Sequence, residues 1–356
     1  MFAASESDVK AVAPTHVENI LPEEYKSSQN QFHQYDTWQD DVKVVRDFPE
    51  QSREVLSKLT PEQVARFHED GYLVIPNFAT RDQLLALARA AEAEVSGFNT
   101  DEYKSVFSTS PDKQHGKSDD YFLDSGDCTR CFYEEGVFDE AGNLKVPKLK
   151  SINKIGHAMH AIHPVFRAYS NSLPHHQVVK SLGYKRPLIA QSMYIFKQPF
   201  VGGKVGCHQD NTFLYTVPTS CIGLWIALDD ATQTNGCLWV IPGSHKGGTK
   251  TRYRLKTEEV TAENGEKRTV RKLYFDPPIT PGMFREEGGI PVEVKAGSLV
   301  LLHGDVVHYS YANTSPNQRH AYTIHVVEGD AGWAKDNWMQ KGCFLPLDGS
   351  ETQVSE

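Results

Sequence analysis

Four residues have the types and spacing of a metal site with an anion-binding group beside it. The segment His208-Gln209-Asp210 supplies an imidazole and a carboxylate, and His308 supplies a second imidazole about a hundred residues later. Two imidazoles and one carboxylate can occupy one face of an octahedral iron(II) ion, which leaves three positions open for a cosubstrate and oxygen. Arg319 follows eleven residues after His308. Its planar guanidinium is suited to hold a carboxylate through paired hydrogen bonds.

Strand geometry predicts how these side chains meet. His208 and Asp210 are two positions apart, so both project from the same face of an extended segment. A Gly-rich stretch, 201–208, leads into His208, and the apolar stretch 298–308 delivers His308. Any one of these histidines alone could equally be a hydrogen-bonded residue without a metal. Their occurrence together, with Arg319 behind them, favours the metal site.

Other histidines of the region are expected to play supporting or structural parts. His303 lies five residues before His308, so the two side chains face opposite sides of one regular strand. We therefore expect His303 to support the ligands or to pack, and His245 to stabilise a turn. His320 and His325 lie on the strand of Arg319, and the sequence assigns them no special role.

Composition indicates a water-soluble globular protein rather than a nucleic-acid-binding or membrane protein. The chain has 356 residues, of which 39% are hydrophobic and 23% charged, enough for a substantial core. Its net charge of −9 argues against a general nucleic-acid surface. No apolar run approaches the roughly 20 residues that span a bilayer. The cysteines are too sparse for a disulfide framework, and we expect reduced thiols at Cys128, Cys131, Cys207, Cys221, Cys237 and Cys343.

The ends of the sequence predict a cytoplasmic location by elimination. The first eight residues, MFAASESD, lack the basic start and apolar stretch of a secretory signal and the arginines of a mitochondrial presequence. The last residues, QVSE, are not a peroxisomal address. The lone C-x-x-C at 128–131 has no second pair at suitable spacing, so we expect two half-buried residues there rather than a zinc site.

The chain is expected to form one domain with two extensions. Residues 1–56 are polar and aperiodic, which predicts a segment that is poorly ordered or lies on the domain surface. A single domain is expected over 57–345, with a charged insertion at about 246–287 that either shapes a site mouth or is solvated surface. Residues 346–356 are expected to be a tail.

Local patterns predict helices first and then many short strands. Thr60 and Thr80 are good helix N-caps, and Gly71 is expected to end the first helix before a strand at 72–75. The stretches 150–160, 164–169 and 177–182 are expected to be helical. After Pro187 a two-residue period predicts strands at 189–197, 204–208, 213–216, 222–228, 236–241, 292–294, 298–303, 306–310 and 320–327. The pattern indicates a mainly β fold with supporting helices, closed or double-sheeted.

Several longer motifs resemble one known family. They are DDYFLDSGD at 119–127, KSINKIGHA at 150–158, QSMYIFKQP at 191–199, NGCLW at 235–239 and IPGSH at 241–245. These stretches resemble the phytanoyl-CoA dioxygenase family of iron(II)/2-oxoglutarate oxygenases, over about 63–338. The resemblance implies a double-stranded β-helix, a jelly-roll or cupin-like core backed by helices.

The resemblance also implies roles for individual residues. It implies His208, Asp210 and His308 as iron ligands, and Arg319, helped by Ser310, as the clamp on the distal carboxylate of 2-oxoglutarate. It implies a cosubstrate pocket lined by four further residues, which are Lys154, Met193, Gln209 and Trp225. On chemical grounds alone, Lys154 could neutralise a second carboxylate. Ser310 lies two residues after His308 and therefore shares its strand face. From chemistry alone, Met193 and Trp225 could equally be core residues.

The expected activity is a dioxygenase that uses iron(II), 2-oxoglutarate and O2 to hydroxylate a small-molecule or acyl substrate, releasing succinate and carbon dioxide. An acyl-CoA, a carboxylate or another metabolite remains open as the substrate, because kinship of fold does not license one. A zinc-dependent jelly-roll hydrolase is an alternative with the same ligands, although it gives Arg319 no task. A non-catalytic metal-binding module is a third possibility.

Overall fold

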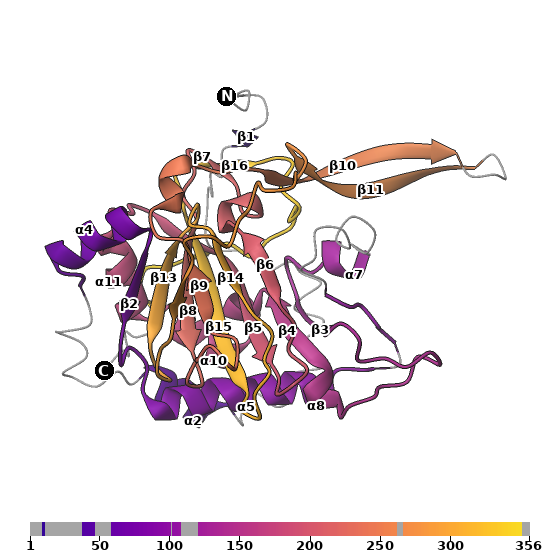
Figure 1. Ribbon diagram of the computed structural model, residues 1–356, viewed down its shortest axis with the longest axis horizontal. Helices are drawn as coiled ribbons and strands as arrows, with labels where there is room; N and C mark the ends of the chain where they lie inside the picture. Colours follow the sequence, from indigo (N-terminus) through magenta and orange to yellow (C-terminus); the bar gives the residue numbers. More distant parts are fainter. Residues whose placement is uncertain are drawn as a thin grey trace.

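Two antiparallel β-sheets form the centre of the protein (Figure 1). Residues of both sheets line one cavity. The computed structural model describes residues 9–10, 38–46, 58–100, 102–107, 120–261 and 266–350. The larger sheet runs, in spatial order, through β2 (Tyr72–Ile75), β13 (Leu299–His303), β8 (Ile222–Ala227), β15 (Arg319–Glu328), β5 (Pro187–Lys197), β4 (Ile152–His157) and β3 (Thr129–Tyr133). The smaller sheet contains β12 (Ile290–Val292), β9 (Leu238–Val240), β14 (His308–Ser310) and β6 (Val205–His208).

Helices cover the outer face of the larger sheet. The helices of the described residues are α2 (Gln39–Arg46), α4 (Pro61–Asp70), α5 (Arg81–Gly97), α7 (Asp120–Leu123), α8 (Lys148–Ser151), α9 (Met159–Ile162), α10 (Pro164–Ser170) and α11 (Leu173–Ser181). Leu87 of α5 and Phe166 of α10 are fully buried in one apolar cluster with Tyr194 of β5 and Tyr322 of β15. From Gln191 onward in β5, and along β15, the even-numbered residues thus face the helices and the odd-numbered ones face the opposite side, toward the cavity. The mainly β jelly-roll fold expected from the sequence is confirmed.

The first two main-domain helices begin where the sequence predicts. The side chains of Thr60 and Thr80 each accept a hydrogen bond from the backbone N–H three residues later. In turn, the side chains of Gln63 and Gln83 accept a hydrogen bond from the backbone N–H of the cap residue. These are two complete capping boxes, which satisfy amides that a helix start leaves unpaired. Gly71 ends α4 at φ 80°, a conformation that favours glycine.

The helix expected over 150–160 is wrong in its central part. Residues Ile152–His157 form β4, with short helices α8 and α9 on either side. The strand pairs with β3 on one edge and β5 on the other. Pairing partners that lie far along the chain therefore override the local pattern. The strand expected at 213–216 is also shorter, because η5 (Asp210–Thr212) turns the chain before β7 (Thr216–Val217).

The charged insertion forms a long two-stranded arm of β10 (Arg252–Thr261) and β11 (Lys267–Asp276). The arm projects away from the body of the molecule (Figure 1). At its base, Arg271 forms ion pairs with Asp120 and Asp124 at α7. Tyr253 and Phe275 of the base are buried and line the cavity. The base of the insertion thus shapes the site, and the outer part is solvated.

Both expected boundaries of the domain change where the structure describes them. Helix α2 falls inside the expected extension, yet Val45 is 0% exposed and its carbonyl accepts a hydrogen bond from Gln83. The rest of the extension lies outside the described residues, apart from β1 (Val9–Lys10), which pairs with β16 (Gly332–Ala334). At the other end β17 (Leu345–Pro346) pairs with β5, and Leu347 is buried. The domain therefore continues past residue 345.

The described part of the chain contains no helix with both the length and the apolar content needed to cross a bilayer. The six cysteines are all unpaired thiols. Burial raises the pKa of the Cys128 thiol to about 11, and burial raises that of Cys131 still further. The C-x-x-C pair therefore consists of protonated, packed side chains, as expected.

Candidate active site

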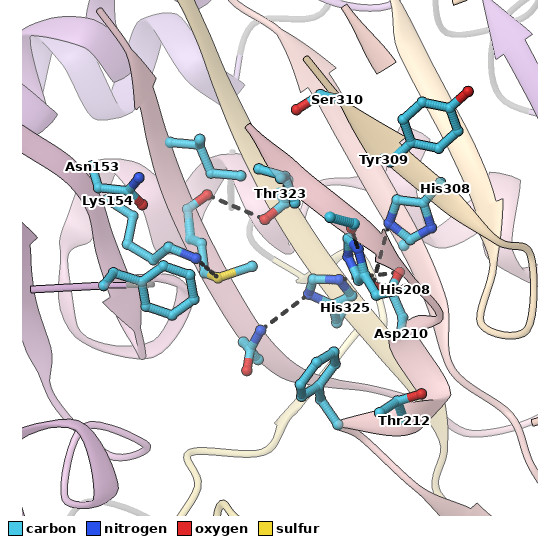
Figure 2. A pocket seen from close by; sticks show the side chains of 18 of the residues that line it. Asn153, Lys154, His208, Asp210, Thr212, His308, Tyr309, Ser310, Thr323 and His325 are labelled. Atoms are coloured by element: carbon cyan, nitrogen blue, oxygen red, sulfur yellow. Dashed lines mark hydrogen bonds and ion pairs between the residues drawn. The ribbon is translucent and has the colours of Figure 1, made fainter. Parts of the chain in front are cut away.

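Three side chains from separate elements converge on one point between the sheets (Figure 2). His208 ends β6, and His308 begins the neighbouring strand β14, where their Cα atoms are direct partners. Their ring centroids are 4.2 Å apart. Asp210 begins η5, and its Oδ1 lies 3.9 Å from Nε2 of His208 and 3.7 Å from Nε2 of His308. One ligand atom from each residue lies within 4.8 Å of the other two, which suits a single metal ion.

Backbone carbonyls fix the orientation of both imidazoles. Nδ1 of His208 donates to the carbonyl of Gly206 at 2.8 Å, and Nδ1 of His308 donates to the carbonyl of Val306 at 3.0 Å. Because a carbonyl can only accept, the proton of each neutral ring sits on Nδ1. The lone pair of each Nε2 is left to face the shared point, as in most histidine metal ligands.

The electrostatics of the site keep the donor atoms of His208 and Asp210 free of protons. Burial, and next the neighbouring His308, lowers the pKa of His208 to about 3. Burial alone would raise the pKa of the Asp210 carboxyl, but His325, His308 and His208 together hold it well below its usual range. A metal ion can therefore bind at neutral pH without first displacing protons from His208 and Asp210.

Arg319 lines the same cavity and has one N–H group without a partner among the described residues. It begins β15, is only 2% exposed, and lines the cavity. Its Nε donates to the carbonyl of Gly236 at 3.0 Å, but Nη1 is buried and has no hydrogen-bond partner among the described residues. The guanidinium lies 5.4 Å from the ring centroid of Trp225. Burial lowers the pKa of Arg319 only to about 10, so the group stays charged.

Ser310 is held beside this region by a buried lysine. Nζ of Lys197 donates to Oγ of Ser310 at 2.7 Å and to the carbonyls of Gly203 and Tyr311 at 2.9 and 2.8 Å. An ammonium group has three N–H bonds, and these three oxygens use all of them. Burial, and next Arg319, lowers the pKa of Lys197, and Glu134 offsets part of this effect. The hydroxyl proton of Ser310 is left free to serve a further acceptor.

The structure places Lys154, Met193 and Trp225 in the cavity lining. Nζ of Lys154 lies 3.8 Å from the sulfur of Met193 and 3.4 Å from the ring centroid of Phe107. Burial lowers the pKa of Lys154 to about 7, and Glu134 offsets part of this effect. A buried amine whose close contacts among the described residues are a thioether and an aromatic ring is well placed to gain an anionic partner.

The structure corrects the expectation for Gln209, which is not among the residues that line the cavity. Its amide donates to the carbonyls of Gly248 and Asp305 and accepts from the amide of Lys250. The reason is the alternation of an extended segment: with His208 and Asp210 facing inward, the residue between them faces outward. Gln209 therefore ties the metal-binding segment to the loop at 248–250.

The cavity has a volume of about 220 Å³, and most of its remaining lining is apolar. Aromatic side chains come from α7, the segment after η5, the arm and the C-terminal region, and they include Phe122, Phe213, Tyr253, Phe275, Phe284 and Trp338. The cationic side chains of the lining are Lys154, Lys197 and Arg319. The cavity thus offers a polar, cationic wall for an anion and an aromatic wall for an apolar group.

Sequence reasoning missed His325, Gln191 and Lys197, all of which line the cavity. The two-residue period of a strand could have found them. Counting from Arg319 along β15 leads to His325, and counting from Met193 along β5 leads to Gln191 and Lys197.

Three further histidines considered in the sequence, His303, His245 and His320, lie outside the cavity lining. His303 faces away from the cavity, and its Nδ1 accepts from the amide of Asp305 at 3.1 Å. His245 donates to the carbonyl of His68 at 2.9 Å. His320 lies on the helix-facing side of β15, 3.2 Å from the hydroxyl of Tyr194.

Comparison with known proteins agrees with this architecture. The chain is 44% identical over 288 residues to a phytanoyl-CoA dioxygenase of Arabidopsis thaliana, covering 81% of this chain and 95% of that protein. It is 45% identical over 296 residues to the phytanoyl-CoA dioxygenase domain-containing protein 1 of Mus musculus, covering 81% and 97%. The fold resembles the crystal structure of EctD from S. alaskensis in its apoform, with a TM-score of 0.51 and 18% identity over 82% of this chain and 85% of that one.

The family model described as phytanoyl-CoA dioxygenase matches residues 67–321, which include every ligand of the triad and Arg319. The match covers more than half of the chain, and the relatives are matched over nearly their whole length. The class of enzyme expected from the sequence is confirmed: the chain belongs to the phytanoyl-CoA dioxygenase family of 2-oxoglutarate-dependent dioxygenases.

Proposed function

We propose that this protein uses iron(II) and 2-oxoglutarate to hydroxylate a small-molecule or acyl substrate, with release of succinate and carbon dioxide. One observation carries the proposal. Two imidazoles and a carboxylate converge within 4.8 Å of one another, and the same cavity is lined by Arg319, whose buried Nη1 is unpaired among the described residues. The first group suits a metal ion, and the second suits the carboxylate of a metal-bound cosubstrate.

The donor set fits iron(II). His208 and His308 would bind through Nε2, because Nδ1 of each ring is engaged by a carbonyl. Asp210 would supply the carboxylate. Two histidines and one carboxylate are typical of non-haem iron(II) oxygenases, and such an ion, when bound, supplies the activation of oxygen. The protein fixes the direction of the three donors and surrounds them with a largely apolar cavity.

The cationic wall fits a dicarboxylate. Arg319 would hold the carboxylate farther from the metal through Nη1, and the free hydroxyl proton of Ser310 would add a second hydrogen bond. Lys154 would balance the charge of the other carboxylate. Trp225 and Met193 would pack on the short carbon chain, since both side chains line the cavity. A buried guanidinium with an unmade hydrogen bond gains more from such a ligand than an exposed one.

A zinc-dependent hydrolase would use the same three ligands. It would leave the buried Nη1 of Arg319 unpaired and the ordering of Ser310 by Lys197 without purpose. The cosubstrate explains both features, so the oxygenase is the function we favour.

The aromatic wall indicates what the substrate presents to the metal. The cations of the described lining are the three that we assign to the cosubstrate side. Side chains such as Phe213, Phe275 and Trp338 remain for the substrate, and they favour an apolar or aromatic part of the molecule. An acyl chain or an apolar metabolite fits this wall better than a densely charged compound.

Anaerobic titration tests the proposal. Iron(II) is added to the metal-free protein, followed by 2-oxoglutarate, and the weak visible band of the metal–keto-acid chelate is followed. We expect the band in the native protein and its loss in Asp210→Ala. Arg319→Ala should retain the metal but lose affinity for 2-oxoglutarate. A native protein that binds iron but forms no chelate would refute the assignment. Succinate release across acyl-CoAs, free acids and apolar metabolites then identifies the substrate.

A further inference from the structure

We infer that His325 and Gln191 form a hydrogen-bonded chain that positions Asp210, so that this residue offers a single oxygen, Oδ1, to the metal. The inference rests on the proposed function and deepens it, because it assigns roles to two residues at the same site. His325 and Gln191 lie in the cavity lining, and each is 6% exposed. Neither is a ligand in the triad, and we regard both as positioning residues.

The two oxygens of the Asp210 carboxylate face different partners. Oδ1 lies 3.9 Å from Nε2 of His208 and 3.7 Å from Nε2 of His308, on the side of the shared point. Oδ2 lies 3.4 Å from Nε2 of His325 on β15 (Figure 2). His325 thus approaches the carboxylate from the larger sheet, while the two ligand imidazoles belong to the smaller sheet.

The second contact of His325 sets its tautomer. Nε2 of Gln191 lies 3.4 Å from Nδ1 of His325, and an amide nitrogen can only donate. Nδ1 therefore accepts, and the ring proton sits on Nε2, which lies 3.4 Å from Oδ2 of Asp210, an oxygen without a hydrogen bond among the described residues. The chain runs in one direction, from the amide of Gln191 through the imidazole to the carboxylate.

Sheet register places the parts of this chain side by side. Gln191 of β5 and Gly223 of β8 are the direct cross-strand partners of His325, one on each side. A Cβ atom at Gly223 would lie 2.9 Å from Oδ2 of Asp210, closer than side chains normally allow. The absence of a side chain there lets the carboxylate approach the sheet closely enough for His325 to reach it.

A carboxylate held in this way leaves the metal with more open positions. A carboxylate that bound through both oxygens would occupy one of the three positions that a chelating cosubstrate and oxygen require. With Oδ2 directed toward His325, Asp210 would offer Oδ1 alone to a bound metal. Partners that orient a metal ligand commonly change metal affinity by roughly 10–100-fold when they are removed.

Binding of Mn(II), a spectroscopic substitute for iron(II), tests the inference without turnover. Free Mn(II) is counted by electron paramagnetic resonance during titration of each variant. We expect His325→Ala to weaken binding roughly tenfold or more. His325→Gln retains an N–H donor and should recover most of the affinity. Gly223→Ala, which places a methyl group against Oδ2, should weaken binding as His325→Ala does.

His320→Gln is the matched control, because His320 lies on the same strand, is equally buried, and faces the helices. It should bind Mn(II) like the native protein. A merely structural role for His325 would lower the melting temperature of the metal-free protein in both His325 variants without separating their Mn(II) affinities. If His325→Ala does not fold, the comparison of Gly223→Ala and His325→Gln with the native protein carries the test.

Two results would overturn the inference while leaving the proposed function intact. One is native Mn(II) affinity in His325→Ala together with weak binding in Asp210→Ala. The other is a crystal structure of the Co(II)-loaded protein in which both oxygens of Asp210 bind the metal. Equal and weak binding by the native protein and Asp210→Ala would instead refute the proposed metal site itself, and the inference with it.

Discussion

Lys197 and Ser310 connect the two sheets of the protein. Lys197 ends β5 of the larger sheet, directly opposite Arg319 of β15, and its ammonium group donates to the hydroxyl of Ser310 on β14 of the smaller sheet. The same contact joins the wall that carries the guanidinium to the strand that carries His308. The geometry of the metal site and that of the anion site are therefore coupled through one buried lysine.

Replacement of this lysine should weaken cosubstrate binding. In Lys197→Met, Ser310 loses the donor that directs its hydroxyl proton, and two backbone carbonyls lose their partner. A hydrogen bond from a charged group contributes about 1.5–3 kcal/mol. We therefore expect the dissociation constant of 2-oxoglutarate to rise about tenfold or more. Titration of the chelate band measures it, with Lys295→Met, which removes an exposed lysine paired with Asp230, as control. Equal affinities in the two variants would contradict this role.

Arg319→Lys should separate charge from geometry at the anion site. Lysine keeps the positive charge but lacks the planar guanidinium of arginine. In the native protein Nε of that guanidinium donates to the carbonyl of Gly236, and Nη1 is left unpaired among the described residues. We expect affinity for 2-oxoglutarate to lie between that of the native protein and that of Arg319→Ala, with metal affinity unchanged. The measurement is paired titration of each variant with metal and with 2-oxoglutarate. A variant that binds 2-oxoglutarate as the native protein does would show that charge alone suffices.

Binding of 2-oxoglutarate should depend on pH through Lys154. Burial lowers the pKa of Lys154 to about 7 in the free protein. A bound carboxylate would raise that pKa, so binding above pH 7 must take up a proton, and below pH 7 the lysine is already charged. Affinity should therefore be highest below pH 7 and fall by up to about tenfold per pH unit above it. Titrations of the metal-loaded protein between pH 6.5 and 9 measure the slope, which should be absent in Lys154→Gln.

Removal of metal should lower thermal stability only while the triad is intact. A ligand that binds the folded state alone stabilises it by about 2.7 kcal/mol at a hundred times its dissociation constant. A chelator should therefore lower the melting temperature of the native protein by several degrees. Asp210→Ala is expected to melt at the same temperature with and without chelator. An equal chelator effect in both proteins would place the stabilising metal elsewhere.

The sequence predicts most of the strands that carry the site because their patterns are local. The two-residue period after Pro187 matches β5, β8, β13 and β15 closely. The spacing of His208 and Asp210 predicts a common face, and the structure brings both together with His308. Arg319 is expected eleven residues after His308, and it is the first residue of β15.

Local sequence patterns do not predict secondary structure or side-chain contacts that depend on segments far away in the chain. Residues 152–157 are a strand because β3 and β5 pair with both edges, and no local signal contains that pairing. His325 becomes important because Asp210 approaches it across Gly223, a contact between segments more than a hundred residues apart. Lys197 likewise depends on Ser310. Periodicity indicates which face such residues occupy, and the fold decides what they meet there.

The arm of β10 and β11 borders the cavity at a distance in sequence from His208, Asp210 and His308. Its base supplies Tyr253 and Phe275 to the cavity, and Arg271 fastens it to α7, which supplies Phe122. None of these residues belongs to the metal-binding triad or the cationic wall. Substitutions in the arm can therefore reshape the compartment that selects a molecule while the oxygen-activating machinery is preserved, which makes the arm the natural place to redirect specificity by engineering.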